Sequence, residues 1–148
     1  MDEFTLKGGG DYLKISIEQV FGFPETTCFS GGYDTKSSVE IYSDGFKAHA
    51  TIWFSTGEVF ELYNQLLKAN NSLTGVVYFT PLENNLEFNA EYDNNGRIII
   101  KGELFKVNDS CVNRLKFEFK SDQSYIQSTL MELEIITNKY GGMKGIKV

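Results

Sequence analysis

Apolar and polar residues alternate along the first third of the chain. The alternation is regular over residues 13–17, starts again at 39–41 and continues over 46–54. A period of two residues is typical of a strand that buries one face. Because a Ser-Asp-Gly turn at 43–45 separates the last two segments, we predict a β-hairpin over residues 37–54.

The hydrophobic period changes at Ser55. Ser55 and Glu58 have the spacing of a capping box, in which the serine oxygen accepts from a backbone N–H three residues on and the glutamate reaches back. The apolar residues that follow recur at helical spacing, namely Val59, Phe60, Tyr63, Leu66 and Leu67. This pattern predicts a helix of about 13 residues with one apolar stripe, ended by Asn70 and Asn71.

Strand patterns return in the second half of the chain. Residues 76–80 are a short apolar segment, and residues 86–92 alternate between apolar side chains and carboxylates or amides. The Asp-Asn-Asn-Gly sequence at 93–96 favours a tight turn, so residues 97–105 are predicted to pair with the segment before it. A further alternating strand is expected at 115–120.

A second helix is predicted to begin near Ser121 and Asp122 and to end before Gly141 and Gly142. Its apolar stripe comprises Tyr125, Ile126, Thr129, Leu130, Leu133 and Ile136. Strands followed by helices packed on an antiparallel sheet are typical of the α+β class. We therefore expect an α+β fold with one or more antiparallel sheets and two helices.

Two junctions in the chain resemble each other. Residues 54–67 and 120–133, aligned residue for residue, both contain the end of a strand, a cap and the start of a helix. The likeness predicts an internal repeat with two halves, residues 1–71 and 72–142, in each of which strands are followed by a helix. The alternative is that the likeness arises by chance, because such junctions are similar in many proteins. The length of the chain indicates one domain over residues 1–148.

The chain is acidic. Its 148 residues carry a formal net charge of −6, which repels phosphates and disfavours direct binding to nucleic acid. An acidic surface suits a basic protein partner, but it also keeps a small protein soluble. No apolar run is long enough to span a membrane, and no basic start precedes an apolar stretch, so we expect a cytoplasmic protein that does not contact membranes.

The sequence contains no recognisable catalytic motif. His49 is the single histidine and has the opposite parity to the apolar face of its strand, so it is expected to point outward. Cys28 and Cys111 lack the spacing of a metal or redox site, and neither a phosphate-binding loop nor a nucleophile elbow is present. We therefore predict no catalytic residue, no metal and no cofactor.

Three carboxylates are candidate contacts with a basic partner. Glu87, Glu91 and Asp93 are expected to share the solvent face of one strand. They are predicted either as an acidic strip that binds a positively charged surface or as an ordinary solvated face.

The segment 20–36 is a second candidate, because it is long for a loop and rich in aromatic residues and glycine. Phe29, Tyr33 and Asp34 are its proposed contacts, since aromatic side chains on loops often anchor interfaces. The alternative is that the rings pack beneath the loop as a satellite of the core. Glu61 on the first helix is a further candidate.

The chain resembles the WapI-type immunity proteins over most of its length. The segments that carry the resemblance are FTLKGGGDYLKISIEQVFGFPETT at 4–27, SGGYD at 30–34, IWFSTGEVFELYNQLLKAN at 52–70 and LKFEFKSDQSYIQSTLMELEIITNKYG at 115–141. The resemblance implies a small bacterial antitoxin without enzymatic activity. Such a protein binds and neutralises the C-terminal domain, often a nuclease, of a contact-dependent toxin, and we expect that domain to be basic.

Two other functions fit parts of the pattern. A small ligand-binding protein or hydrolase would use the 20–36 loop as a lid, and it would need a deep pocket with converging polar groups beneath that loop. A structural subunit would only form homo-oligomers through its outer strands.

Overall fold

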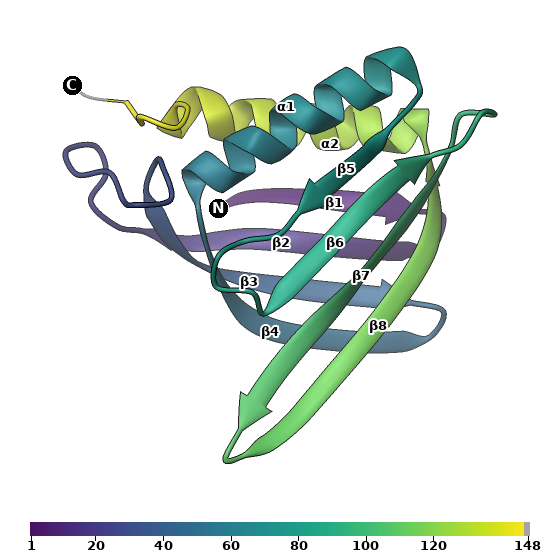
Figure 1. The fold of residues 1–148 in the computed structure, drawn as a ribbon, viewed down its shortest axis with the longest axis horizontal. Helices are drawn as coiled ribbons and strands as arrows, with labels where there is room; N and C mark the ends of the chain where they lie inside the picture. Colours follow the sequence, from purple (N-terminus) through teal and green to yellow (C-terminus); the bar gives the residue numbers. More distant parts are fainter. Residues whose placement is uncertain (147–148) are drawn as a thin grey trace.

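The computed structural model describes residues 1–146, in which four strands and a helix are followed by four more strands and a second helix (Figure 1). The first half consists of β1 (Asp2–Gly8), β2 (Asp11–Val20), β3 (Asp34–Ser43), β4 (Phe46–Ser55) and α1 (Thr56–Ser72). The second half consists of β5 (Val76–Phe79), β6 (Leu86–Tyr92), β7 (Arg97–Asn108), β8 (Cys111–Asp122) and α2 (Gln123–Tyr140). The predicted α+β class is confirmed.

Each half contributes one four-stranded antiparallel sheet, and neighbours in sequence are neighbours in the sheet. The hairpin predicted over residues 37–54 is confirmed, because β3 pairs with β4 along its whole length. Asp44 and Gly45 at its turn have φ values of 49° and 86°. Two successive residues with positive φ give the turn a twist that matches the twist of the two strands.

One hydrophobic core contains residues of both sheets and both helices. Most of the alternating residues predicted to point inward are buried, among them Leu13, Ile15, Ile17, Ile52, Phe54, Phe88, Ala90, Ile98 and Ile100. Phe46 shares the parity of Ile52 and Phe54 but is 68% exposed, because it lies at the turn end of β4. The helices lie side by side above the sheets (Figure 1). No helix within residues 1–146 has the length and apolar character that a membrane crossing needs.

The helices close one edge of each sheet, and each helix covers the sheet of the other half. On the edge strand β1, the Thr5 N–H donates to Glu132 Oε1 at 3.0 Å and the Thr129 hydroxyl donates to the Thr5 carbonyl at 2.6 Å. On the edge strand β5, the Tyr78 N–H donates to Gln65 Oε1 at 3.1 Å and Gln65 Nε2 donates to the Tyr78 carbonyl at 3.2 Å. These contacts leave the two strands unable to pair with another chain at those positions.

The helix caps align the two halves differently from the alignment predicted from the sequence. Ser55 caps α1 and Asp122 caps α2, and if the caps are equivalent, Val59 corresponds to Ile126. Val59 and Ile126 are both buried. The alignment of residues 54–67 with 120–133 instead pairs Ile126 with Phe60, which is only half-buried. An alignment by the caps thus differs by one residue from the expected alignment, and the internal repeat stays a prediction.

The β7–β8 hairpin is longer than the predicted strands at 97–105 and 115–120. Its tip projects from the body of the molecule (Figure 1) and turns at Asp109 and Ser110, which both have positive φ. Both faces of the tip are exposed, including Val107 and Val112. A strand without a buried face has no need of alternating hydrophobicity, so the period-two pattern misses it.

Candidate functional site

The predicted acidic strip lies on the outer face of β6. Glu87 and Glu91 are exposed there, on the side of the strand opposite the core. Asp93 follows the strand, and its Oδ1 accepts from the backbone N–H groups of Asn95 at 2.8 Å and Arg97 at 3.0 Å. The Asp93 carboxylate therefore holds the β6–β7 turn, whereas the two glutamates remain open to solvent.

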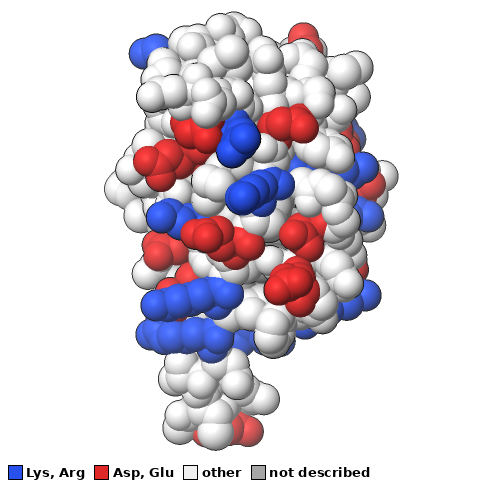
Figure 2. All heavy atoms as spheres, turned by 90° about the vertical axis from the view of Figure 1, so that its right-hand side faces the viewer, with Lys and Arg blue, Asp and Glu red and all other residues white. Residues whose placement is uncertain are grey.

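Basic side chains interrupt this face. The strand register places Asn89 opposite Lys101, Lys101 opposite Glu118, and Lys116 opposite Glu103. Figure 2 shows lysines and arginines side by side with carboxylates on the face above the projecting β7–β8 hairpin. The charge of β6 is thus balanced by β7 and β8, and the sheet does not present a continuous acidic surface.

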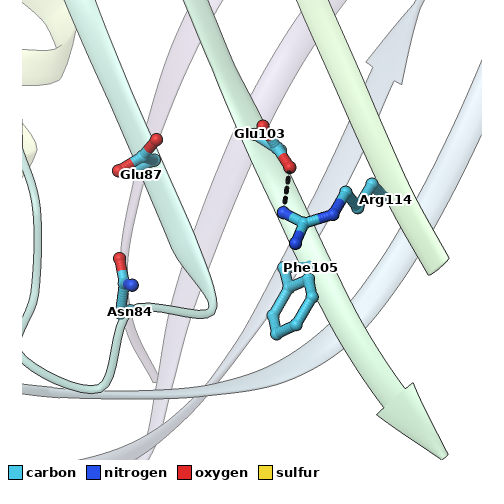
Figure 3. Close-up of a pocket in the computed structure, with 5 residues that line it drawn as sticks. All are labelled: Asn84, Glu87, Glu103, Phe105 and Arg114. Carbon is cyan, nitrogen blue, oxygen red and sulfur yellow. Dashed lines mark hydrogen bonds and ion pairs between the residues drawn. The ribbon is translucent and has the colours of Figure 1, made fainter. Parts of the chain in front are cut away.

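A shallow hollow of about 210 Å³ lies at one end of this face (Figure 3). Arg114 Nη1 donates to Glu103 Oε1 at 2.7 Å, and the guanidinium lies 4.4 Å from the centre of the Phe105 ring. Glu87 and Asn84 line the opposite side. Because Arg114 already neutralises Glu103, Glu87 is the free carboxylate of the hollow.

The loop predicted at 20–36 spans residues 21–33, because β2 ends at Val20 and β3 begins at Asp34. The Phe29 side chain is 100% exposed on this loop, and Asp34 is exposed at its end. Tyr33, in contrast, is 0% exposed. The prediction that Tyr33 contacts a partner is therefore wrong for this conformation, since no part of its side chain reaches the surface.

Aromatic rings fill the space beneath the loop. The Tyr33 ring packs edge-on against Phe23, which packs edge-on against Tyr140, with ring centres 5.1 Å and 5.0 Å apart. The Tyr33 hydroxyl lies within hydrogen-bonding distance of the carbonyl oxygens of Pro24 and Ile146. Tyr33 belongs to the core and Phe23, which is 37% exposed, packs against it, whereas Phe29 faces solvent. The role of the loop as an interface stays a prediction. The rings packed in this space count against a deep pocket that the loop would cover as a lid.

The loop is fixed to the start of α1. The Thr56 N–H donates to the Tyr33 carbonyl at 2.8 Å, the Gly57 N–H donates to the Gly31 carbonyl at 3.2 Å, and the Tyr33 N–H donates to Thr56 Oγ1 at 2.8 Å. A Cβ at Gly32 would lie 2.5 Å from the backbone nitrogen of Gly57, and Gly32 has a φ of 65°. The SGGYD segment therefore fits closely on the helix and holds Phe29 in place.

A groove of about 440 Å³ separates this loop from β4 and from the connection between β5 and β6. The residues that line it are Phe21, Phe29, Ser30, Asp34, Thr35, Trp53, Phe54, Glu58, Leu82 and Glu83. Phe21 stacks on Trp53 with ring centres 6.4 Å apart, and Trp53 is 43% exposed. Three carboxylates line the groove, and among residues 1–146 no lysine or arginine lines it.

Glu58 differs from the other carboxylates of the groove because both of its oxygens are occupied. Oε1 accepts from the Ser55 N–H at 2.9 Å, and the Ser55 oxygen accepts from the Glu58 N–H at 3.1 Å, which confirms the predicted capping box. Oε2 accepts from the Leu82 N–H at 3.0 Å. Glu58 therefore joins the helix to one wall of the groove, and Asp34 and Glu83 are left as its exposed acids.

Several residues of the groove carry no signal that predicts them from the sequence. Leu82 and Glu83 lie in an irregular connection and reach the groove only through tertiary structure. Trp53 did carry a signal, because it has the outward parity of β4 and yet is large and aromatic. Glu61 is exposed on α1 but lines neither the groove nor the hollow.

The two cysteines and the histidine lie in different elements: Cys28 is in the 21–33 loop, His49 is in β4 and Cys111 begins β8. Burial, together with the nearby Asp34 carboxylate, raises the pKa of the Cys28 thiol above its usual value, so the nucleophilic thiolate is disfavoured. His49 is exposed on the outer face of its strand, as predicted. Within residues 1–146, no three of the histidine, cysteine and acidic side chains gather in a way that could hold a metal ion.

A small α+β domain with exposed rings beside carboxylates has the features of a protein-binding module. Residues 4–141 match the model of the immunity protein WapI-like family, and the chain belongs to this family. The resemblance seen in its sequence segments is confirmed. Neither a curated protein nor a solved structure matches the chain.

Proposed function

We propose that this protein is the antitoxin of a bacterial contact-dependent toxin, and that it binds the C-terminal toxin domain in the cytoplasm and neutralises it. The match of residues 4–141 to an immunity protein family carries the proposal. The chain takes no chemical step in this function. Neutralisation follows from occupation of the toxin surface.

We propose a nuclease as the toxin domain, because such a partner matches the charge of this chain. An active cleft that holds phosphates is usually basic. The net charge of −6 attracts such a cleft over a distance and raises the rate of encounter. The bound protein then blocks access of nucleic acid by its volume and by its negative charge.

A rescue experiment tests this function. The toxin domain encoded next to this gene is expressed in a sensitive strain with and without the antitoxin, and growth is measured. Binding of the two purified proteins is then measured by calorimetry. We expect restored growth and a stable complex, whereas a toxin domain from an unrelated system serves as the control and should be neither bound nor neutralised.

Each half of the experiment has a result that contradicts the proposal. Growth that is not restored by the cognate pair would rule out an antitoxin role. Restored growth without a complex, accompanied by a covalent change in the toxin domain, would instead indicate an enzyme that inactivates it.

A further inference from the structure

The groove between the 21–33 loop, β4 and the β5–β6 connection has the features of a docking site. On the basis of the function proposed above, we infer that this groove binds the toxin domain and that it accepts an arginine side chain flanked by apolar groups. The groove is hereafter called the aromatic groove.

Exposed rings provide the apolar part of the aromatic groove. Phe29 is 100% exposed, Trp53 is 43% exposed and Leu82 is 68% exposed, so water contacts apolar surface in the groove. Covering such surface with a partner is favourable. Aromatic side chains at the centre of an interface often contribute a large part of the binding free energy.

The groove is already formed before a partner binds. Hydrogen bonds from Thr56 and Gly57 fix the 21–33 loop, and the Glu58 carboxylate fixes the β5–β6 connection through Leu82. Both walls are therefore attached to the same end of α1. Because these segments need little further ordering, less conformational entropy is lost on binding.

The charge of the groove selects a cationic occupant. Asp34 and Glu83 are exposed, and the nearest base given by the strand register is Lys36, which lies opposite Trp53 at the border of the groove. A guanidinium is flat, stacks on aromatic rings and pairs with carboxylates through two parallel hydrogen bonds. The stacked Phe21–Trp53 pair beside free carboxylates offers both interactions.

The outer face of β6 is a weaker candidate for the same role. Lys101 and Lys116 lie among its acids, and Arg114 neutralises Glu103. A basic partner would meet repulsion there as well as attraction. A second copy of this chain is also an unsuitable occupant of the aromatic groove, because face-to-face association would bring the carboxylates of both copies together.

Single variants of the full chain test the inference against the cognate toxin domain encoded next to the gene. Phe29→Ala removes an exposed ring, and Glu83→Lys reverses an exposed charge, so neither variant disturbs the core. Glu87→Lys on β6 is the matched control. Thermal unfolding by circular dichroism establishes that each variant is folded, and binding kinetics are measured at two salt concentrations.

We expect each groove variant to weaken binding by about tenfold or more, and Glu83→Lys to lower the association rate and its dependence on salt. Glu87→Lys should change the affinity by less than about twofold. Replacing the contacting arginine of the toxin domain by glutamate should restore binding to Glu83→Lys.

The outcomes separate this inference from the proposed function. If the wild-type chain binds the toxin domain but Phe29→Ala and Glu83→Lys bind it equally well, the aromatic groove is not the docking site and the antitoxin role stands. If Glu87→Lys alone weakens binding, the outer face of β6 is the docking site. If the wild-type chain does not bind, the function and the inference both fail.

Discussion

The aromatic groove and the outer face of β6 both present carboxylates, but their surroundings differ. On β6, neighbouring strands supply Lys101 and Lys116, so that charges alternate across the sheet. In the aromatic groove, the acids lie beside exposed rings, and no basic residue in the described part of the chain lines the groove. The charges along one strand are therefore not enough to predict the charge of the surface, because the strand register determines which side chains of the neighbouring strands lie beside them.

The largest effect is expected from a change that displaces the loop of the aromatic groove. Gly32→Ala would place a Cβ close to the Gly57 nitrogen at a positive φ, and we expect a loss of about 2–3 kcal/mol of unfolding free energy together with weaker toxin binding. Urea denaturation measures the loss. Gly10→Ala is the control, because a Cβ there meets no atom within 4 Å. Equal stability of the two variants would show that the loop does not need this close fit.

The local signals in the sequence predict the secondary structure of this region, but they do not predict the contact between the 21–33 loop and α1. The alternation over residues 13–17 and 46–54 and the cap at Ser55 are local signals, and they correctly predict strands and a helix. The SGGYD segment could be recognised as unusual, but its attachment to Gly57 could not, because that contact joins residues distant in sequence. The hairpin tip gave no alternation since neither of its faces is buried.

The candidate contacts also divide into residues that local patterns place and residues that only tertiary packing places. Phe29 and Glu87 were predictable as exposed residues from loop length and strand parity. That Tyr33 is buried, and that Leu82 and Glu83 lie across a groove from Phe29, depends on how separate segments pack. The pattern of residues along the chain does not describe how distant segments pack. It therefore predicts which single residues are exposed, but not the surface that they form together.

A smaller effect is expected from the Glu58 carboxylate, which joins the start of α1 to the β5–β6 wall of the aromatic groove. Glu58→Ala removes the acceptor of the Ser55 and Leu82 N–H groups, and we expect a loss of about 1–3 kcal/mol in unfolding free energy. Glu61→Ala removes the same charge from an exposed position of the same helix and should change stability by less than about 0.5 kcal/mol. Chemical denaturation compares the two variants. A similar loss in both would mean that helix charge, and not the capping contacts, is responsible.

A still smaller effect is expected from the ion pair between Arg114 on β8 and Glu103 on β7, which lies in the hollow beside the outer face of β6. The Arg114 and Glu103 side chains are 58% and 21% exposed, so the pair is screened by solvent. A double-mutant cycle of Arg114→Ala and Glu103→Ala should give a coupling below about 1 kcal/mol. Adding salt should reduce the coupling further. A much larger coupling would identify this hollow as a rigid site that needs its own function.

The least disturbing test uses the two free cysteines, one in the 21–33 loop that forms a wall of the aromatic groove and one on the β7–β8 hairpin. Cys28 precedes Phe29 in the loop and is half-buried, whereas Cys111 is exposed at the tip of the β7–β8 hairpin. Iodoacetamide, followed by mass spectrometry of the peptides, should modify Cys111 first near neutral pH. Burial and Asp34 raise the pKa of Cys28, so its modification should become faster as the pH increases and the thiolate forms.

Adding the cognate toxin domain turns this labelling into a map of the interface. A partner seated on the aromatic groove covers Phe29 and should slow the modification of Cys28, while Cys111 should react at the same rate as in the free chain. Protection of Cys111 alone would place the contact on the β7–β8 hairpin and would contradict docking in the groove. Because the wild-type chain is used throughout, a loss of folding cannot account for either result.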